Sequence, residues 1–331
     1  MAAATTLVLT RRDVQDLLSL DECLTAVESA FRLHADGRSL APGVLGIHAR
    51  EGGFHIKAAG LEDGRVYFAA KTNANFPGNP RRFGLPTIQG VIVLCDGEDG
   101  RVLAVMDSME VTLRRTAAAT ALAARHLARR DAAVATVVGC GTQGWAQIRA
   151  LSRVLPLSRV YAFDTDPAAA ERLARELSAE LSIDVRAVRD LAEAAPQTQV
   201  WATCTPARAP ILRREDVAPG AFVAAVGADN EEKQELDAPL MAASTIVVDI
   251  LEQCAAIGDL HHAIRAGAVK REDVHAELAE VVAGRKPGRT RDDEITIFDS
   301  TGTALQDVAA AAAVYRKAVA SGAGLNVVLG E

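Results

Sequence analysis

The chain of 331 residues is long enough for two domains, because a domain averages about 150 residues. Hydrophobic residues make up 49% and charged residues 24% of the chain, as in a globular protein with a sizeable core. The net charge of −7, with no block of like charge, argues against nucleic acid or an anionic membrane surface as a partner.

The N-terminal segment, Met1–Thr10, has a short apolar run with no basic residue before it. Arg11 and Arg12 follow this run, which reverses the order found in a signal peptide. The sequence also lacks the run of about 18 apolar residues that is needed to span a membrane. We therefore expect a cytoplasmic protein without a membrane partner.

The segments that follow predict a first domain of mixed structure. Residues 21–37 read as a helix that Asp21 can cap and Gly37 can end. Three short strands are predicted next, at Phe54–Ala58, Val66–Thr72 and Gln89–Leu94. The loop Asn73–Pro86 is long for a compact domain, and such loops are often functional.

The first of these strands has two distinct faces. Phe54, Ile56 and Ala58 share one face. His55 and Lys57 share the other face. If the apolar face packs on the core, His55 and Lys57 face either solvent or a polar cleft, and the spacing does not decide between the two.

The second half of the chain predicts a parallel sheet. An alanine-rich helix, Thr112–Arg130, is expected to link the two domains, and short apolar strands alternate with helical segments beyond it. Continuous apolar strands are typical of a parallel sheet that is buried on both faces. The predicted strands are Ala133–Val138, Arg159–Phe163, Val200–Cys204, Phe222–Val226, Thr245–Asp249 and Ile295–Phe298, and a last helix is predicted at Ala304–Ala320.

These elements predict an α/β fold, with a Rossmann-type doubly wound parallel sheet domain and a smaller α+β domain. We place the smaller domain at residues 1–126, completed by a C-terminal helix at 304–331. The sheet domain then occupies residues 127–303.

A glycine-rich turn follows the first strand of the sheet domain. Gly139, Gly141 and Gly144 have the G-x-G-x-x-G spacing, and the helix Trp145–Leu155 is predicted directly after them. In a strand–turn–helix context the first glycine makes the turn and the second lets the backbone approach a pyrophosphate. The third glycine lets the helix pack on the strand. The pattern predicts a dinucleotide cofactor.

The second strand of this domain ends at Asp164, and Thr165 follows. A carboxylate there can accept hydrogen bonds from both ribose hydroxyls and would repel a 2′-phosphate. No arginine follows to offset that repulsion. We therefore expect NAD rather than NADP.

The five cysteines show no metal-binding spacing. They lie at 23, 95, 140, 204 and 254, without a C-x-x-C pair. We expect neither a metal site nor a disulfide framework, and the cysteine count suits a reducing cytosol.

Several other segments follow one another along nearly the whole chain in the order of a known family. They are Lys71 with its Asn/Pro/Gly loop, Gly84-Leu-Pro-Thr87, Asp107-Ser108, Arg115-Thr116-Ala-Ala, the glycine turn with Gln143, Gly227-Ala-Asp229 with Lys233 and Glu235-Leu-Asp237, and Ser300-Thr-Gly302 with Gln306-Asp307. Together they resemble the ornithine cyclodeaminase/mu-crystallin family. The resemblance implies a homodimer, with the smaller domain serving substrate binding and dimerisation. It also implies NAD(P)-dependent chemistry on small amino or imino acids.

The resemblance also assigns roles to single residues. Lys71, Thr87 and Arg115 match substrate-binding positions, and Asp229 matches the acid placed for proton transfer. A guanidinium suits a substrate carboxylate, and Lys71 adds a second charge or, if burial deprotonates it, exchanges a proton. From the residues alone, Arg115 could equally form a surface ion pair and Asp229 could equally be a turn residue. The expected cofactor contacts are Gly139, Gly141, Thr142, Gln143, Gly144, Asp164, Thr165, Thr205, Val226, Ser300 and Gly302.

Two positions depart from the family pattern. The arginine that cyclodeaminases carry after a proline pair is replaced by Gly43, and the usual methionine–proline pair by Lys57-Ala58. We predict that Lys57 faces the active site and takes over recognition of an anionic substrate group. This favours small neutral or acidic substrates over ornithine.

Three functions remain open on the sequence. The first is an NAD-dependent amino-acid dehydrogenase or imine reductase that moves hydride to or from the α-carbon. The second is an ornithine or lysine cyclodeaminase that releases ammonia without net cofactor change. The third is a cofactor-bound binding protein without turnover, although a pure binder needs no acid/base group.

Overall fold

The computed structural model describes residues 5–329, which form two compact units. Unit 1 comprises the chain up to Ala118 and again from Thr303 onward, and unit 2 comprises Ala119–Gly302. Residues 1–4 of the segment Met1–Thr10 and residues 330–331 of the predicted C-terminal helix lie outside the described part.

The division between the units falls inside helix α4 (Ser108–Leu127), whereas the sequence suggested a boundary at its end. The last turn of the helix is bonded within unit 2. The carbonyl of Leu127 accepts hydrogen bonds from Nε of Arg289 at 2.7 Å and Oγ1 of Thr296 at 2.7 Å. These bonds explain why the second part of α4 belongs with the parallel sheet.

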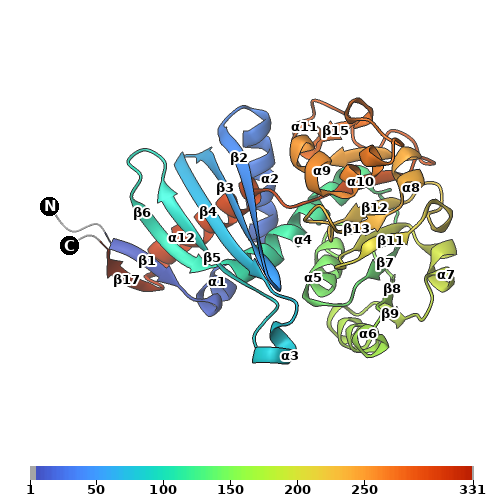
Figure 1. Cartoon of the computed structure of the whole chain (residues 1–331), viewed down its shortest axis with the longest axis horizontal. Coiled ribbons are helices and arrows are strands. Elements are labelled where there is room, and N and C mark those ends of the chain that lie inside the picture. The colour runs from blue at the N-terminus through green and yellow to red at the C-terminus, as the bar shows by residue number, and fades with distance from the viewer. Residues whose placement is uncertain (1–4, 330–331) are drawn as a thin grey trace. The chain divides into compact units, whose positions relative to one another are not determined.

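Unit 1 is built on a seven-stranded sheet in the order β17-β1-β6-β5-β4-β3-β2 (Figure 1). The strands are β1 (Thr5–Leu9), β2 (Ser39–Ala49), β3 (Gly52–Asp63), β4 (Arg65–Asn75), β5 (Ile88–Asp96), β6 (Val102–Asp107) and β17 (Leu325–Val328). All neighbours are antiparallel except β1 and β6. The sequence predicted only β3, β4 and β5 of these strands.

Helices cover one face of this sheet. They are α1 (Arg11–Leu17), α2 (Leu20–Ala35) and α12 (Ala304–Ser321), and α12 packs on β3, β4 and α2. The helix α12 ends at Gly322, whose φ of +71° suits a glycine, so the predicted helix 304–331 is too long. The loop expected at Asn73–Pro86 is shorter than predicted, because β4 runs on to Asn75 and a short helix, α3 (Asn79–Phe83), forms within it.

The sequence raised the case in which the apolar face of β3, with Phe54, packs on the core. The structure shows the opposite orientation. Lys57 and Leu61 lie on the face under the helices and are 5% and 1% exposed. Phe54 lies on the opposite face and is 39% exposed. The outer face of the sheet in unit 1 is therefore apolar and open.

Unit 2 confirms the predicted α/β fold. The eight strands of its main sheet are all parallel, in the order β15-β14-β16-β12-β10-β7-β8-β9. They are β7 (Val134–Val138), β8 (Arg159–Phe163), β9 (Asp184–Ala187), β10 (Val200–Thr203), β12 (Phe222–Ala225), β14 (Thr245–Val248), β15 (Ala276–Glu277) and β16 (Thr296–Asp299). The sequence order reverses beside β7, with β8 on one side and β10 on the other, and ligands of such sheets bind at this point.

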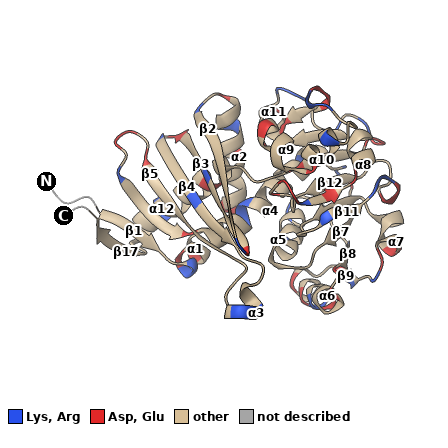
Figure 2. Ribbon diagram, in the orientation of Figure 1, with Lys and Arg blue, Asp and Glu red and all other residues tan. Residues whose placement is uncertain are grey.

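Helices and one short strand pair complete unit 2. The helices are α5 (Thr142–Leu151), α6 (Pro167–Leu181), α7 (Leu191–Ala194), α8 (Ala238–Ala242), α9 (Leu251–Ile257), α10 (Asp259–Arg265) and α11 (Leu278–Val282), and the pair is β11 (Arg208–Leu212) with β13 (Gln234–Leu236). Basic and acidic residues are intermingled along α6 (Figure 2). Among the helices of residues 5–329, none is both long and apolar enough to cross a bilayer.

Candidate active site

The glycine turn joins β7 to α5 in the predicted order. Gly139 has a φ of +98°, which side chains rarely tolerate. A Cβ on Gly144 would lie 2.1 Å from the carbonyl oxygen of Gly139, so the helix can approach the turn only with glycine there. A Cβ on Gly141 would meet nothing within 4 Å. The chain thus leaves open space at the glycine that is expected to face the pyrophosphate.

The first turn of α5 is suited to an anion. Gly141 caps this helix without a side-chain hydrogen bond, so its first amide N–H groups remain available to a ligand. The helix begins at Thr142 rather than at Trp145, which places Thr142 and Gln143 in its first turn. These features fit the pyrophosphate of a dinucleotide.

Asp164 lies beside the glycine turn. Its Oδ2 accepts a hydrogen bond from the backbone N–H of Cys140 at 2.7 Å, and its Oδ1 accepts from that of Asp166 at 2.9 Å. Thr165 is its neighbour in the chain, at the carboxyl end of β8. The structure thus brings the predicted ribose-binding acid and the predicted phosphate-binding turn together.

Buried carboxylates hold the other predicted cofactor loops. Oε1 of Glu235 accepts hydrogen bonds from the backbone N–H of Thr205 at 2.6 Å and from its hydroxyl at 2.8 Å. Oε2 of Glu235 accepts from the N–H of Gly227, next to Val226, at 2.8 Å. Glu235 is fully buried, and sequence analysis gave it no role.

Asp249 likewise accepts hydrogen bonds from the loop after β16. Its Oδ2 accepts hydrogen bonds from the hydroxyl of Ser300 at 3.1 Å and from the N–H of Gly302 at 2.6 Å. Asp249 is also fully buried. Thr205, Val226, Ser300 and Gly302 all follow parallel strands, so these carboxylates fix one edge of the sheet.

Two further buried acids, Asp259 and Asp299, are less completely bonded. Oδ2 of Asp259 and Oδ1 of Asp299 have no hydrogen-bond partner among the described residues. Burial and the nearby Asp249 carboxylate raise the pKa of Asp299 to about 7. Burial, Asp299 and Glu235 also raise the pKa of Asp259 well above its usual value. At least one of the two acids therefore keeps its proton near neutral pH.

Asp229 follows β12 at the carboxyl edge of the same sheet. Its Oδ1 accepts a hydrogen bond from Nζ of Lys233 at 2.6 Å, and its side chain is 35% exposed. Asp229 is thus accessible and oriented by a cation four residues later in the chain. Their i,i+4 spacing in the sequence is a signal from which the partner of Asp229 could have been predicted.

The predicted substrate cations of unit 1 meet at one carboxylate. Nζ of Lys71 lies 2.7 Å from Oδ2 of Asp307, and Nε of Arg115 lies 3.0 Å from Oδ1. Nη1 of Arg115 donates to Oε1 of Gln306 at 2.9 Å. Lys71, Arg115 and Asp307 are 3%, 4% and 1% exposed. The reading of Arg115 as a surface ion pair is therefore wrong.

This cluster has an unusual charge state. Burial lowers the pKa of Lys71 to about 7, with Arg115 and Lys57 acting in the same direction and Asp307 opposing them. Although burial alone would raise the pKa of Asp307, Lys71 and Arg115 hold it below its usual value. Asp307 is therefore ionised at neutral pH, while Lys71 is poised between its two protonation states.

Lys57 joins this cluster, whereas Thr87 does not. Lys57 pairs directly with Lys71 across β3 and β4 and is buried, so it does not lie on an exposed strand face. Val44 is its partner on β2, next to Gly43 in the chain. Thr87 precedes β5, and the β4–β5 register places it several residues along the strand from Lys71.

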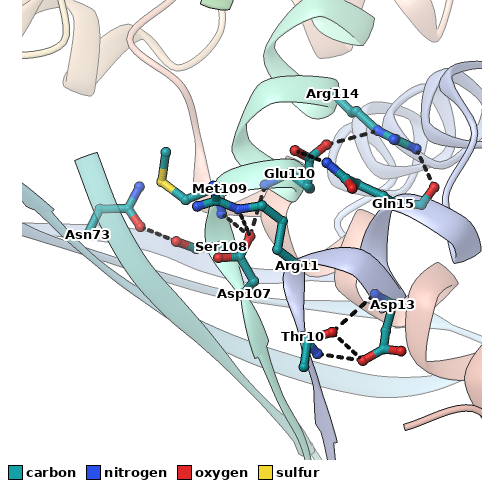
Figure 3. A network of polar contacts seen from close by, with 10 residues as sticks. All are labelled: Thr10, Arg11, Asp13, Gln15, Asn73, Asp107, Ser108, Met109, Glu110 and Arg114. Atoms are coloured by element: carbon teal, nitrogen blue, oxygen red, sulfur yellow. Dashed lines mark hydrogen bonds and ion pairs between the residues drawn. The ribbon is translucent and has the colours of Figure 1, made fainter. Parts of the chain in front are cut away.

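A polar network fixes the start of α4, which carries Arg115 (Figure 3). Oδ1 of Asp107 accepts hydrogen bonds from the N–H groups of Met109 at 3.0 Å and Glu110 at 3.2 Å, so the helix begins at Ser108 and not at Thr112. The hydroxyl of Ser108 donates to Oδ1 of Asn73 at 2.6 Å. Asn73 lies on β4, so this bond ties the helix to the strand of Lys71.

Comparison with known proteins identifies the family of this chain. The model of the ornithine cyclodeaminase/mu-crystallin family matches residues 4–322. Alanine dehydrogenase of Archaeoglobus fulgidus is 40% identical over 327 residues, which cover 97% of this chain and 98% of that protein. The chain belongs to the ornithine cyclodeaminase/mu-crystallin family.

Two solved structures resemble this chain over nearly its whole length. An archaeal alanine dehydrogenase dimer with bound NAD is 39% identical with a TM-score of 0.94, covering 99% of this chain and 100% of the other. Δ1-Pyrroline-2-carboxylate reductase of Thermococcus litoralis, in complex with NADH and L-proline, is 32% identical with a TM-score of 0.93, covering 97% and 100%. Within residues 5–329 of this chain, no group of three or more His, Cys, Asp or Glu side chains could hold a metal ion.

Proposed function

We propose that this chain, an NAD-dependent oxidoreductase of amino or imino acids, transfers hydride between nicotinamide and the α-carbon of a small substrate that carries a carboxylate. The observation that carries the proposal is the buried pair Lys71 and Arg115 on Asp307. Among the described residues, Nη2 of Arg115 has no hydrogen-bond partner, and Lys71 has further ammonium N–H groups beyond its contact with Asp307. Such remaining donors match a ligand that offers only acceptors, as a carboxylate does.

Each residue then has one task. Arg115 and Lys71 hold the substrate carboxylate, with Lys57 as a further contact on the substrate side. Thr87 lies outside this cluster and takes no part in holding the carboxylate. Asp229, oriented by Lys233, exchanges a proton with the substrate nitrogen. When it is bound, NAD supplies or accepts the hydride. The glycine turn, Asp164 and the loops after β10, β12 and β16 bind and orient the cofactor.

A dehydrogenase or imine reductase is favoured over a cyclodeaminase by the position of Lys57. The side-chain ammonium of ornithine would enter a site that already holds the buried Lys57, Lys71 and Arg115. Two cations about 4 Å apart repel by about 4 kcal/mol at an effective dielectric constant of 20. Small neutral or acidic substrates avoid this repulsion.

A substrate panel tests the proposal. L-Alanine, L-aspartate, L-proline, L-ornithine and L-lysine are each incubated with NAD, and pyruvate is incubated with NADH plus ammonia or methylamine. Absorbance follows NADH, and a second assay follows ammonia. Net NADH turnover supports the oxidoreductase, ammonia without net NADH points to the cyclodeaminase, and neither signal with any substrate leaves a binding protein without turnover.

We propose that the protein is a homodimer joined through the outer face of the unit 1 sheet. Leu45, Ile47, Phe54 and Val91 lie on this face and are 39–54% exposed. Exposed apolar patches mark interaction surfaces, and a second copy is the partner that the dimeric archaeal relative suggests.

All five cysteines are free thiols, which supports a reducing compartment such as the cytoplasm.

Light scattering after gel filtration tests the dimer. Ile47→Asp should shift the mass from dimer to monomer, because it puts a charge on the apolar face. Val319→Asp is the matched control, since Val319 is 58% exposed on α12, away from that face. A wild-type monomer, or an equal effect of both variants, would contradict the proposed interface.

A further inference from the structure

Asp307 is the common partner of both substrate cations. It lies in the first turn of α12, whose start is fixed by Thr303, because the hydroxyl of Thr303 accepts a hydrogen bond from the N–H of Leu305 at 3.3 Å. One oxygen of Asp307 contacts Lys71 from β4, and the other contacts Arg115 from α4. Three separate elements of unit 1 therefore meet at this carboxylate.

The contacts of Asp307 also determine what Arg115 can still bind. Nε is taken by Asp307 and one N–H of Nη1 by Gln306. A bidentate hold on a substrate carboxylate therefore has to use Nη2 and the second N–H of Nη1, at the end of the guanidinium rather than along its Nε side. Gln306 is fully buried, so this orientation of the guanidinium is held on both sides.

We infer that Asp307 is a positioning residue of the substrate site, which orients the guanidinium of Arg115 and the ammonium of Lys71 so that both present their remaining N–H groups to one substrate carboxylate. The inference rests on the proposed function. The simpler alternative is an ion pair that only stabilises the fold. An ion pair of that kind affects stability without affecting substrate binding or its pH dependence.

Asp307 also influences the proton on Lys71. Burial, Arg115 and Lys57 favour the neutral amine, and Asp307 is the group that opposes them. Removing the charge of Asp307 therefore moves the loss of the Lys71 proton to a lower pH. Because a neutral amine binds a carboxylate weakly, the alkaline fall of kcat/KM should move in the same direction.

Two substitutions separate charge from position. Asp307→Asn removes the charge, and Asp307→Glu keeps the charge but displaces it by one methylene. The matched control is Asp96→Asn, because Asp96 is 2% exposed, also in unit 1, and paired with Arg65 and Arg101. The pH dependence of kcat/KM is recorded from pH 5.5 to 10 with the best substrate of the panel.

The expected results differ among the variants. Asp307→Asn raises KM about tenfold or more, changes kcat less, and shifts the alkaline fall of kcat/KM to lower pH by about one unit or more. Asp307→Glu raises KM but leaves the fall where it is in the wild type. Asp96→Asn lowers the melting temperature with KM and the pH profile unchanged. Unchanged KM and pH profile in folded Asp307→Asn would overturn the inference. If that variant does not fold, an unchanged KM in Asp307→Glu would overturn it.

A second readout does not depend on turnover. In protein labelled with 15N-lysine, the Nζ signal that is lost in Lys71→Arg is assigned to Lys71 and titrated in the wild type and in Asp307→Asn. A shift of its titration to lower pH supports the inference even if the panel yields no substrate. An unshifted titration contradicts it, and the substrate panel shows separately whether the proposed function fails.

Discussion

Asp229 is exposed enough to reach a ligand and has its carboxylate fixed by Lys233. Asp229→Asn keeps the size of the side chain but removes the titrating group, so turnover should fall by about 10²–10⁴. NADH affinity should change little, because Asp229 is not part of the glycine turn. Steady-state kinetics and fluorescence titration of NADH measure the two effects. Near-normal turnover would remove Asp229 from the reaction and leave Lys71 as the acid/base candidate.

Asp164 should decide between the two nicotinamide cofactors. We expect NADH to bind about tenfold or more tightly than NADPH, because a like-charge contact in a partly desolvated site costs on the order of 1–3 kcal/mol. Asp164→Asn still offers an oxygen to the N–H of Cys140 and should improve NADPH binding while NADH binding changes little. Nicotinamide fluorescence gives all four dissociation constants. Equal wild-type affinities would mean that Asp164 does not face the ribose.

The charge cluster in unit 1 shows the limit of residue-level prediction. Lys71 and Arg115 were assigned to the substrate site through a resemblance, but the carboxylate that joins them was not. Asp307 is 192 positions from Arg115, and no local pattern connects residues so far apart. The same holds for Glu235 and Asp249, whose partners are backbone N–H groups and hydroxyls of other loops that no sequence pattern specifies.

Among the elements, β5 contains a glycine that the neighbouring network requires. A Cβ on Gly90 would lie 2.2 Å from the carbonyl oxygen of Thr72, 2.3 Å from Oδ1 of Asn73 and 2.8 Å from Oγ of Ser108. Gly90→Ala should therefore break the Asn73–Ser108 bond and lower the free energy of unfolding by about 1–3 kcal/mol.

Gly46→Ala provides the control for this substitution. Gly46 lies on β2 of the same sheet, and a Cβ there would meet nothing within 4 Å. Urea denaturation should show a lower midpoint for Gly90→Ala alone, and its KM should rise because α4 carries Arg115. Equal midpoints for the two variants would show that the sheet accommodates the methyl group.

Elements with a local signal were predicted well, and elements that depend on distant partners were not. The strand–turn–helix around Gly139 was predicted because its glycines and apolar residues are neighbours in the chain. By contrast, β1 and β17 pair with each other from opposite ends of the chain. Most residues of β2 are exposed, so this strand lacks the apolar alternation that reveals a half-buried strand.

For the molecule as a whole, the pair Asp259 and Asp299 should make stability depend on pH. Burial and Asp249 raise the pKa of Asp299 to about 7, above the unfolded value of 3.8. The folded chain therefore holds a proton that the unfolded chain releases, and this contribution to stability is fully present below pH 3.8 and lost as the pH rises through about 7. In Asp299→Asn the asparagine side chain does not titrate, so this variant lacks the contribution.

The difference in unfolding free energy between wild type and Asp299→Asn isolates this contribution. The unfolding free energy of the wild type minus that of Asp299→Asn should fall between pH 5 and pH 8. Its slope should reach up to about 1.4 kcal/mol per pH unit. Urea denaturation of both proteins at pH 5, 6.5 and 8 measures it. A difference that is constant across these conditions would show that Asp299 is ionised throughout.

The pairing of β1 with β17 affects the order in which the two units can fold during synthesis. Unit 2 is one continuous stretch of chain, whereas unit 1 is completed only by α12 and β17, which are synthesised last. During translation, unit 2 can fold as soon as it leaves the ribosome, while Lys71 and Arg115 wait for Asp307. A released chain that ends at Gly302 should therefore bind NADH and yet have no competent substrate site.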